Sequence, residues 1–354
     1  MKKIMSVFAA LFLTMAVCMC ACADDAVHTS GDYEYYIDND GNAIICGYRG
    51  DAKDVIVPSL LDSHPVVALG DLSFNSPSAV SVLIPDTVIS IGEWAFCGCD
   101  ALSSVEIPNS VTDIGRNPFV FHDVSIKVRT DHPVLATIDG VLFNKITKTL
   151  IYCPRGLSGT YTIPDGILEI GCDAFMHCDY ITSVKIPMSV KTIDESAFAY
   201  CQSLVSVEIP NSVTTLCGWV FYNCPSLTSV ILPNSIVAIE EYTFGGCTSL
   251  THVEIPESVV TIGDEAFQEC KSLISVEIPS HVSSIGNEAF YYCLYLESVT
   301  LPLSVTSIGE EAFNTLNNKN YLTLKVFPDS YAEKYAKEND FTYKYIEDTS
   351  WLQS

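Results

Sequence analysis

The sequence predicts a solenoid of stacked β-coils, with a parallel sheet on one face and short helical or 3-10 turns between the strands. Three observations support this fold class. Proline recurs at a constant spacing, as from Pro85 to Pro108, phenylalanine follows each of these prolines by eleven residues, and cysteine follows most of them by fourteen. A unit of this length buries too little apolar surface to fold alone, so neighbouring units must stack and share one core.

The repeat, with a period of twenty-three residues, is visible at three positions of every unit. The prolines are Pro85, Pro108, Pro164, Pro187, Pro210, Pro233, Pro256, Pro279 and Pro302. The phenylalanines are Phe96, Phe119, Phe175, Phe198, Phe221, Phe244, Phe267, Phe290 and Phe313. The cysteines are Cys99, Cys178, Cys201, Cys224, Cys247, Cys270 and Cys293, and His122 and Leu316 take the other two places. The step from Pro108 to Pro164 is two periods plus ten residues, which indicates an interruption.

Within each unit, the residue types predict the local structure in order. Ser-Val-Glu-Ile before a proline alternates polar and apolar residues, as a strand with one buried face does. Proline ends the strand because it cannot donate to a ladder. Ile-Gly then turns the chain, and Ala-Phe forms at most one helical turn. About eleven coils spaced about 4.8 Å apart would make a rod roughly 50 Å long.

The glycine of the turn is absent from three units, where Asp194, Cys217 and Glu240 replace it. A turn that needed a left-handed backbone would not tolerate these residues without strain. We therefore expect that the turn does not demand positive φ, or that these three coils are locally strained.

The N-terminal segment at 1–23 has the features of an export signal. Lys2 and Lys3 precede an apolar run at 4–16, and the small residues at 21–23 predict cleavage before Asp24. The alternative is a membrane anchor, because the apolar stretch approaches the lower limit for spanning a bilayer.

Lipid attachment is a second possibility for the same segment. Met19-Cys20-Ala21-Cys22 loosely resembles a bacterial lipobox, with Cys22 as the acylated residue and Met19 where an aliphatic residue is usual. We expect residues 24–32 to form a short linker to the repeats.

The repeat unit resembles a known family. The string Leu250-x-x-Val-x-Ile-Pro256-x-x-Val-x-x-Ile-Gly-x-x-Ala-Phe267-x-x-Cys270 is similar to the signature of BspA-like leucine-rich repeat surface proteins. The resemblance covers 33–346 and implies a leucine-rich repeat solenoid. It also implies a bacterial protein that is secreted or attached to the cell surface, and several relatives bind host matrix proteins or other cells.

The ends and the interruption also resemble elements of that family. Residues 33–57 are similar to its usual N-terminal cap, with a hairpin turn at 38–41, and the interruption at about 131–159 is similar to its insertion. Residues of about 323–346 are similar to its C-terminal cap, in which Ser330 begins a short helix that leads to a last strand. We expect 347–354 to be a tail.

Cysteine usage has two interpretations. Beyond the signal, twelve cysteines remain, and an even number in an exported chain suggests disulfides. Seven of them, however, recur at one position of the repeat, where free thiols would stack coil on coil as small buried apolar groups. We predict reduced thiols that bond the neighbouring backbone.

The charge and the absence of motifs exclude several classes of function. The net charge of −25 disfavours nucleic acid, which needs a basic stripe. We find no hydrolase, zinc-protease, phosphate-loop or dinucleotide motif, and expect no catalytic residues, cofactor or metal. The sequence at 38–41 has some features of a calcium loop but lacks its glycine and late glutamate, which favours the hairpin turn.

Two sets of residues are candidates for binding a partner. The outward strand residue two places before the proline is acidic in four coils, at Glu106, Glu208, Glu254 and Glu277. These residues form either a solvated sheet face or a partial acidic stripe for a basic or hydroxyl-rich partner. Tyrosines near the Phe turn, Tyr291 and Tyr292 among them, either cover the coil edge or contact a partner.

We therefore predict a non-catalytic exported protein that mediates adhesion or recognition through a repeat solenoid. Its partner would be a host or microbial surface protein or glycan, possibly basic, with no membrane insertion after signal cleavage. The alternatives are a self-associating spacer of the cell envelope and, more remotely, a hydrolase with its site in the insertion at 131–159.

Overall fold

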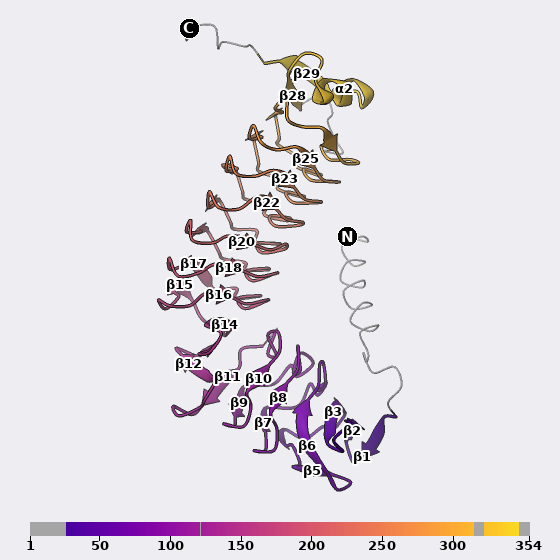
Figure 1. Ribbon diagram of the computed structural model, residues 1–354, viewed down its shortest axis with the longest axis vertical. Helices are drawn as coiled ribbons and strands as arrows, with labels where there is room; N and C mark the ends of the chain where they lie inside the picture. The colour runs from indigo at the N-terminus through magenta and orange to yellow at the C-terminus, as the bar shows by residue number, and fades with distance from the viewer. Residues whose placement is uncertain (1–25, 121, 315–321, 347–354) are drawn as a thin grey trace.

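The structure is a computed structural model that describes residues 26–120, 122–314 and 322–346. It is a β-solenoid of about 13 turns, rather than the expected eleven (Figure 1). The predicted signal, cleavage before Asp24, acylation of Cys22 and tail at 347–354 lie outside the described residues. Among the described residues, no helix has the length and apolar character needed to cross a membrane.

Strands that end at or near the repeat prolines form the row that the alternation predicted, here named the major row. Its members are β4 (Asp54–Ile56), β7 (Ser81–Leu83), β9 (Ser104–Ile107), β11 (Ser125–Val128), β15 (Gly159–Thr162), β17 (Ile181–Lys185), β19 (Ser206–Glu208), β21 (Ser229–Ile231), β24 (Ser275–Glu277), β26 (Ser298–Thr300), β28 (Thr323–Val326) and β29 (Thr342–Tyr345). They pair in parallel, and equivalent residues of successive repeats meet, as Ser183 meets Ser206. Each coil thereby supplies the hydrogen-bonding edge that its neighbour needs.

A second parallel row, here named the minor row, was not predicted. It consists mainly of two-residue strands before the turn: β8 (Ser90–Ile91), β10 (Asp113–Ile114), β16 (Glu169–Ile170), β18 (Thr192–Ile193), β20 (Thr215–Leu216), β22 (Ala238–Ile239), β23 (Thr261–Ile262), β25 (Ser284–Ile285) and β27 (Ser307–Ile308). Two residues are too few to give an alternating pattern, so the sequence carried no signal for these strands.

The N-terminal cap begins earlier than we expected. In addition to the hairpin of β2 (Tyr33–Ile37) and β3 (Ala43–Tyr48), strand β1 (His28–Ser30) pairs antiparallel with β2. The expected linker at 24–32 is therefore wrong for residues 28–30, which belong to the sheet. Strands β5 (Leu60–Leu61) and β6 (His64–Leu69) connect the cap to the minor row.

The C-terminal cap contains helix α2 (Tyr331–Glu338). The Ser330 hydroxyl accepts from the Glu333 N–H, as the sequence predicted, and the Glu333 carboxylate accepts from the Asp329 N–H. Because α2 packs against β27, β28 and β29, it covers the apolar end of the stack.

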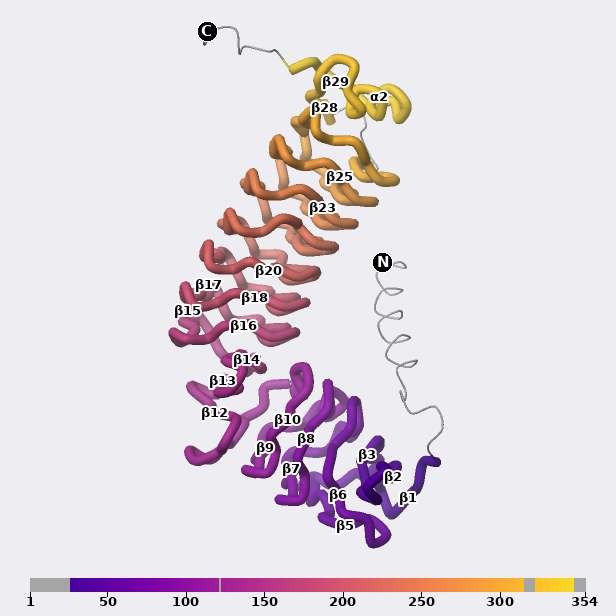
Figure 2. Tube along the Cα trace, viewed as in Figure 1, coloured from indigo at the N-terminus to yellow at the C-terminus, as the bar shows by residue number. Residues whose placement is uncertain are grey.

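The insertion forms a three-stranded antiparallel meander. Its strands are β12 (Leu135–Ile138), β13 (Val141–Asn144) and β14 (Thr149–Tyr152), and β14 rejoins the minor row by pairing in parallel with β16. The column of coils changes direction at this point (Figure 2).

Stacked aromatic rings run through the core on both sides of the insertion. The nine repeat phenylalanines and Phe74 are fully buried. Consecutive phenylalanine rings within each stack lie 4.9–5.6 Å apart between centroids. Offset stacking at this spacing adds to the area that each ring buries.

The cysteines form the expected column of free thiols. The seven cysteines at the repeat position are buried and form no disulfide with one another. The thiols of Cys201, Cys224, Cys247, Cys270 and Cys293 each donate to the carbonyl of the phenylalanine of the preceding coil, at 3.1–3.2 Å. The thiol therefore fills the corner of the coil and satisfies a backbone acceptor there.

The turn contains glycine because neighbouring coils approach each other closely there, and not because the backbone has a positive φ. A Cβ at Gly286 would lie 2.5 Å from the Asp264 nitrogen of the preceding coil, and φ there is not positive. The left-handed residue of the turn lies two places later and is not glycine: Ser196, Trp219 and Tyr242 have φ of 55°, 62° and 52°. The expectation that the turn glycine does not need positive φ is thus confirmed. The backbone strain lies at the residue two places later instead.

Candidate functional site

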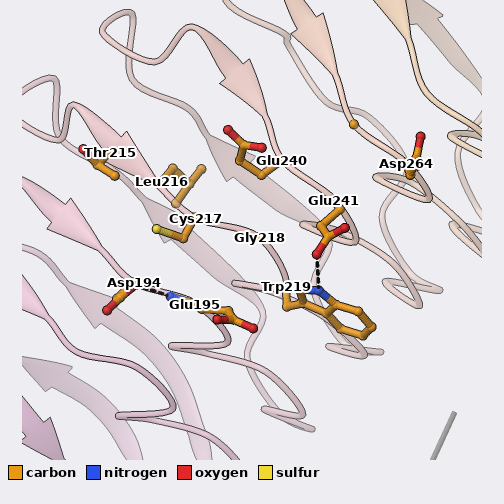
Figure 3. A pocket seen from close by; sticks show the side chains of 11 residues that line it. Asp194, Glu195, Thr215, Leu216, Cys217, Gly218, Trp219, Glu240, Glu241 and Asp264 are labelled. Atoms are coloured by element: carbon orange, nitrogen blue, oxygen red, sulfur yellow. Dashed lines mark hydrogen bonds between the residues drawn. The ribbon is translucent and has the colours of Figure 1, made fainter. Parts of the chain in front are cut away.

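The coils without the turn glycine form a groove on the edge of the solenoid. Asp194, Cys217 and Glu240 occupy the turn position that is glycine in the other repeats, such as Gly286. At Gly286 the backbone of the preceding coil lies so close that a Cβ would clash with it. Asp194, Cys217 and Glu240 line a hollow of about 530 Å³ (Figure 3).

Successive coils stay at a similar spacing beside this hollow, because the Cys217 N–H donates to the Ile193 carbonyl at 3.0 Å and the Gly286 N–H to the Ile262 carbonyl at 2.8 Å. A similar hollow lies beside the glycines of other turns, at Gly92 and Gly115, so the side chains change the lining of the groove and not its presence.

The groove is acidic and aromatic. Asp194, Glu195, Glu240, Glu241 and Asp264 line it together with Trp219, and no lysine or arginine does. The Trp219 indole N–H donates to the Glu241 carboxylate at 3.2 Å, as the dashed line in Figure 3 shows. This contact fixes the indole beside the groove.

Trp219 belongs to a series of stacked rings along the turn edge. Its ring lies 3.9 Å from that of Tyr242 at 22°, and 4.7 Å from that of Tyr222 at 64°. Tyr222 meets Tyr200 edge-on at 5.4 Å, and Tyr200 stacks on His177 at 4.7 Å. All five rings are half-buried, so they present a firm apolar surface beside the carboxylates.

Further carboxylates continue along the same edge toward the C terminus. In the next two coils, Glu265 and Glu288 occupy the left-handed position that Tyr242 occupies in its own coil. The Gln268 side-chain amide donates to both carboxylates. Burial, the larger cause, and the neighbouring Glu288 raise the pKa of Glu265. The edge therefore concentrates negative charge where it is partly shielded from water.

Cys217 is not a nucleophile in this setting. Burial and the carboxylates of Asp194, Glu195 and Glu240 raise its pKa to about 12. A thiol that stays protonated at neutral pH neither attacks a substrate nor binds a soft metal well. Among the described residues, no group of three or more histidines, cysteines and carboxylates could hold a metal ion.

The predicted glutamates of the strand face do not lie together in one stripe. Glu106 is in register with Leu83 on one side and Lys127 on the other. Glu208 lies between Lys185 and Ile231.

The other two glutamates, Glu254 and Glu277, occupy the same position of two consecutive coils. Glu254 lies in a coil that forms no strand in the major row, and Glu277 is in register with Thr300. All four glutamates are exposed, but a lysine and an apolar residue border both Glu106 and Glu208. Their role in binding stays a prediction.

The predicted tyrosines lie on the turn edge, beyond the groove. Tyr291 and Tyr292 are half-buried, and their centroids lie 6.2 Å apart. The Lys271 ammonium lies 5.4 Å from the centre of the Tyr292 ring and 3.0 Å from the Glu269 carboxylate. The tyrosines are thus separate from the strand-face glutamates and close to the acidic edge.

Sequence reasoning missed the groove, although it noticed three of the residues that line it. The three turns without glycine at Asp194, Cys217 and Glu240 are consecutive units, and this was the available signal. Their acidic neighbours Glu195 and Glu241 were not considered because the search for charge followed the strands.

The insertion, the remote candidate for a hydrolase site, is built mainly from backbone pairing and apolar packing. Val141, Leu142 and Phe143 are buried. Its buried histidine, His132, contacts backbone groups on both ring nitrogens.

Two parallel strand rows joined by an open edge of turns, repeated at a constant interval along the chain, define a leucine-rich repeat solenoid. The chain belongs to the BspA type leucine-rich repeat family, whose model matches residues 67–161, 168–297 and 218–339 in six copies.

Solved structures show the same fold. A leucine-rich repeat protein from Eubacterium ventriosum is 22% identical, covers 82% of this chain and 94% of its own, and has a TM-score of 0.61. One from Bacteroides ovatus is 24% identical, covers 90% of this chain and 100% of its own, and has a TM-score of 0.51. No curated protein matches the chain.

Proposed function

We propose that this chain is a non-catalytic, exported bacterial protein that binds a cationic segment of a host or microbial surface protein along its turn edge. Membership of a repeat family built for recognition supports the binding role. The N-terminal sequence, with its basic start, apolar run and small residues, supports export to the cell surface or the medium.

The observation that carries this proposal is the acidic groove beside the Trp219–Tyr242 stack. Arginine and lysine side chains interact with indole and phenol faces and with carboxylates at once. The groove offers both kinds of group on one rigid edge, and a net charge of −25 would speed the approach of a basic partner.

The test compares two faces of one molecule. The groove variant is Asp194→Asn, Glu240→Gln, Glu241→Gln and Asp264→Asn, and it leaves Glu195 unchanged because this carboxylate contacts Arg116. The matched control removes four charges from the strand face, at Glu106, Glu208, Glu254 and Glu277, by Glu→Gln. Binding of an arginine-rich peptide to the secreted form is titrated at low and physiological salt.

We expect the groove variant to weaken peptide binding at least about tenfold, and the control variant to weaken it much less. Trp219→Ala, which keeps every carboxylate, should also weaken binding. If the strand-face variant alone loses affinity, the binding surface is the strand face. Peptide binding that neither variant changes would refute a site on either surface.

Two further measurements complete the proposal. Pull-down with the mature protein against matrix proteins and glycans would identify the partner class. A spacer role would instead show as self-association in sedimentation without affinity for any of these. Mass spectrometry of the native N terminus separates cleavage before Asp24 from a lipid on Cys22.

A further inference from the structure

The insertion divides the solenoid into two stacks. One buried cluster runs from Tyr35 to Tyr152 and another from Val141 to Phe341. Between them the ring column changes, because Phe119 meets Tyr152 edge-on, at 5.7 Å and 69°. Both strand rows also stop, the major row between β11 and β15 and the minor row between β10 and the meander.

Two separate seams hold the stacks together. On the turn edge, Arg116 contacts Glu93 at 3.4 Å and Glu195 at 2.9 Å, and the Trp94 indole N–H donates to Asp173 at 3.0 Å. We name this the turn-edge seam.

The second seam is made by the insertion itself. The buried ring of His132 contacts the Pro108 carbonyl at 3.1 Å, which ties the start of the meander to the end of β9. At the far end of the meander, the Tyr152 hydroxyl donates to the His122 carbonyl at 3.1 Å. We name this the insertion seam.

The contacts of His132 admit only a neutral ring. Its Nδ1 faces the N–H groups of Val134 at 3.2 Å and Leu135 at 3.0 Å, and these groups can only donate. Nδ1 must therefore carry the lone pair, and Nε2 carries the hydrogen that is donated to Pro108. A proton on Nδ1 would oppose two backbone donors and place a charge where the side chain is fully buried.

The surrounding charges do not relieve this cost. Lys145 donates to the His132 carbonyl, while Asp131, the nearest carboxylate, is held by Arg129 at 3.0 Å and by Asn109 at 3.2 Å. Burial first, and then Lys145, lower the pKa of His132, against the opposing effects of the Pro108 contact and Asp131. Because the native pKa is lowered, the stabilisation by His132 is complete above the ordinary value and is lost as the pH falls.

Acid has the opposite effect on one contact of the turn-edge seam. Asp173 is buried, and burial raises its pKa to about 6 despite the contacts from Trp94 and Arg116, with Glu195 and Glu93 nearby. Protonation in acid removes a buried charge, and the neutral carboxyl can still accept from Trp94. The Trp94 contact of the turn-edge seam therefore persists in acid, whereas the Arg116–Glu93 pair weakens, because burial raises the pKa of Glu93 as well.

We propose that residues 129–159 form an acid-released joint, in which protonation of His132 frees the insertion from Pro108 and lets one stack turn on the other about the turn-edge seam. The direction of the solenoid, and so the arc of the edge that faces a partner, would then depend on pH. This inference does not require the groove to bind any particular partner.

The test measures amide hydrogen exchange of the mature protein at pH 7.5 and pH 4, expressed as protection relative to the unstructured peptide. We expect the protection of the Val134 and Leu135 amides to fall at least about tenfold at pH 4, because their hydrogen bonds to the His132 ring are lost. The amides of the repeats at 256–300 should keep their protection at pH 4. Small-angle scattering should show a changed maximum dimension, with an unchanged far-ultraviolet dichroism spectrum.

Two variants assign the effect to the ring. His132→Gln removes the titration, so protection at Val134 and Leu135 should no longer depend on pH, whatever its level at pH 7.5. His252→Gln, at an exposed position, should behave as the parent does. Unchanged protection in the parent at pH 4, equal loss in the repeats, or a persistent pH response in His132→Gln would each refute the joint. Local exchange without a change in scattering would refute the movement of the stacks.

Discussion

The stack after the insertion and the stack before it differ in the regularity of their coils. After the insertion, each phenylalanine follows the last by one strict period, and neighbouring rings tilt by 5–21°. Before it, the step from Tyr48 to Phe74 is three residues longer than the period, the step from Phe74 to Phe96 is one residue shorter, and the tilts are 31° and 35°. The one strict step there, Phe96 to Phe119, again gives 5°.

This difference teaches that coil length sets the stacking geometry. Equal coils bring equivalent atoms into register, whereas an added or missing residue must be absorbed by rotating the side chain or bending the backbone. The thiol contact follows the same rule, at 3.1 Å for Cys247 and 3.7 Å for Cys99. Regularity in the sequence thus appears as tighter and more uniform contacts.

The largest expected effect comes from removing one ring of the regular stack. Phe244→Ala deletes a buried ring between two stacked neighbours and should cost about 3–5 kcal/mol of unfolding free energy. In a solenoid the damage spreads to adjacent coils, so hydrogen exchange should rise in the coils on either side of the gap.

The matched variant is Phe74→Ala, an equally buried ring of the less regular stack. Each substitution should raise exchange within its own stack, because the insertion separates the two buried clusters. Loss of protection across both stacks from either variant would mean that the chain unfolds as one cooperative unit.

The seam between the two stacks allows a second comparison, with a defined pH dependence. Burial raises the pKa of Asp173 to about 6, compared with about 3.9 in an unfolded chain. The neutral carboxyl is therefore the form that the fold favours, and stability falls as pH rises from about 4 to above 6. The shift corresponds to roughly 3 kcal/mol.

Asp173→Asn should remove the loss of stability that the parent shows as pH rises. The side-chain amide oxygen can still accept from the Trp94 indole, so the variant should be more stable than the parent at pH 7.5 and close to it at pH 4, by urea unfolding at both values. Asp264→Asn, at an exposed carboxylate, serves as the control and should show no such difference. An Asp173→Asn variant that loses more stability at pH 7.5 than at pH 4 would show that the ionised carboxylate holds the seam.

A smaller effect is expected where coils approach most closely. Gly286→Ala places a Cβ 2.4 Å from an Asp264 carboxylate oxygen and 2.5 Å from its backbone nitrogen, so the coils must separate. The cost should reach about 1–3 kcal/mol in urea unfolding. Gly166→Ala is the control, since its φ of 90° strains the backbone while no atom lies within 4 Å of the new Cβ. Equal costs would show that contact between coils is unimportant.

The sequence predicted those features that repeat with the period of the coil. The positions of Pro256, Phe267 and Cys270 were sufficient for the major row, the ring column and the thiol column, because each depends on spacing alone. The minor row was missed because a two-residue strand has no pattern of its own. The strand β1 was missed because its residues, His28 to Ser30, include no strong β-former apart from Thr29.

The acidic lining of the groove could not be predicted from spacing, because it depends on residues that differ from one coil to the next. Cys217 and Glu240 were recognised as departures, but their consequence depends on how much room the adjacent coil leaves. That distance is a property of packing between coils. The charges of Glu195 and Glu241 matter only because they border the hollow.

The smallest effect is expected at the left-handed turn position. Ser196 has φ of 55°, a conformation that costs an L-residue about 1 kcal/mol but costs glycine little. Ser196→Gly should therefore stabilise the protein by about 0.5 kcal/mol, after the greater freedom of glycine in the unfolded chain is deducted. The same substitution at Ser206, an exposed residue of strand β19, should destabilise it, since glycine weakens a strand. Thermal unfolding of the two variants measures opposite shifts, and shifts of the same sign would show that backbone strain at the turn is not what distinguishes these positions.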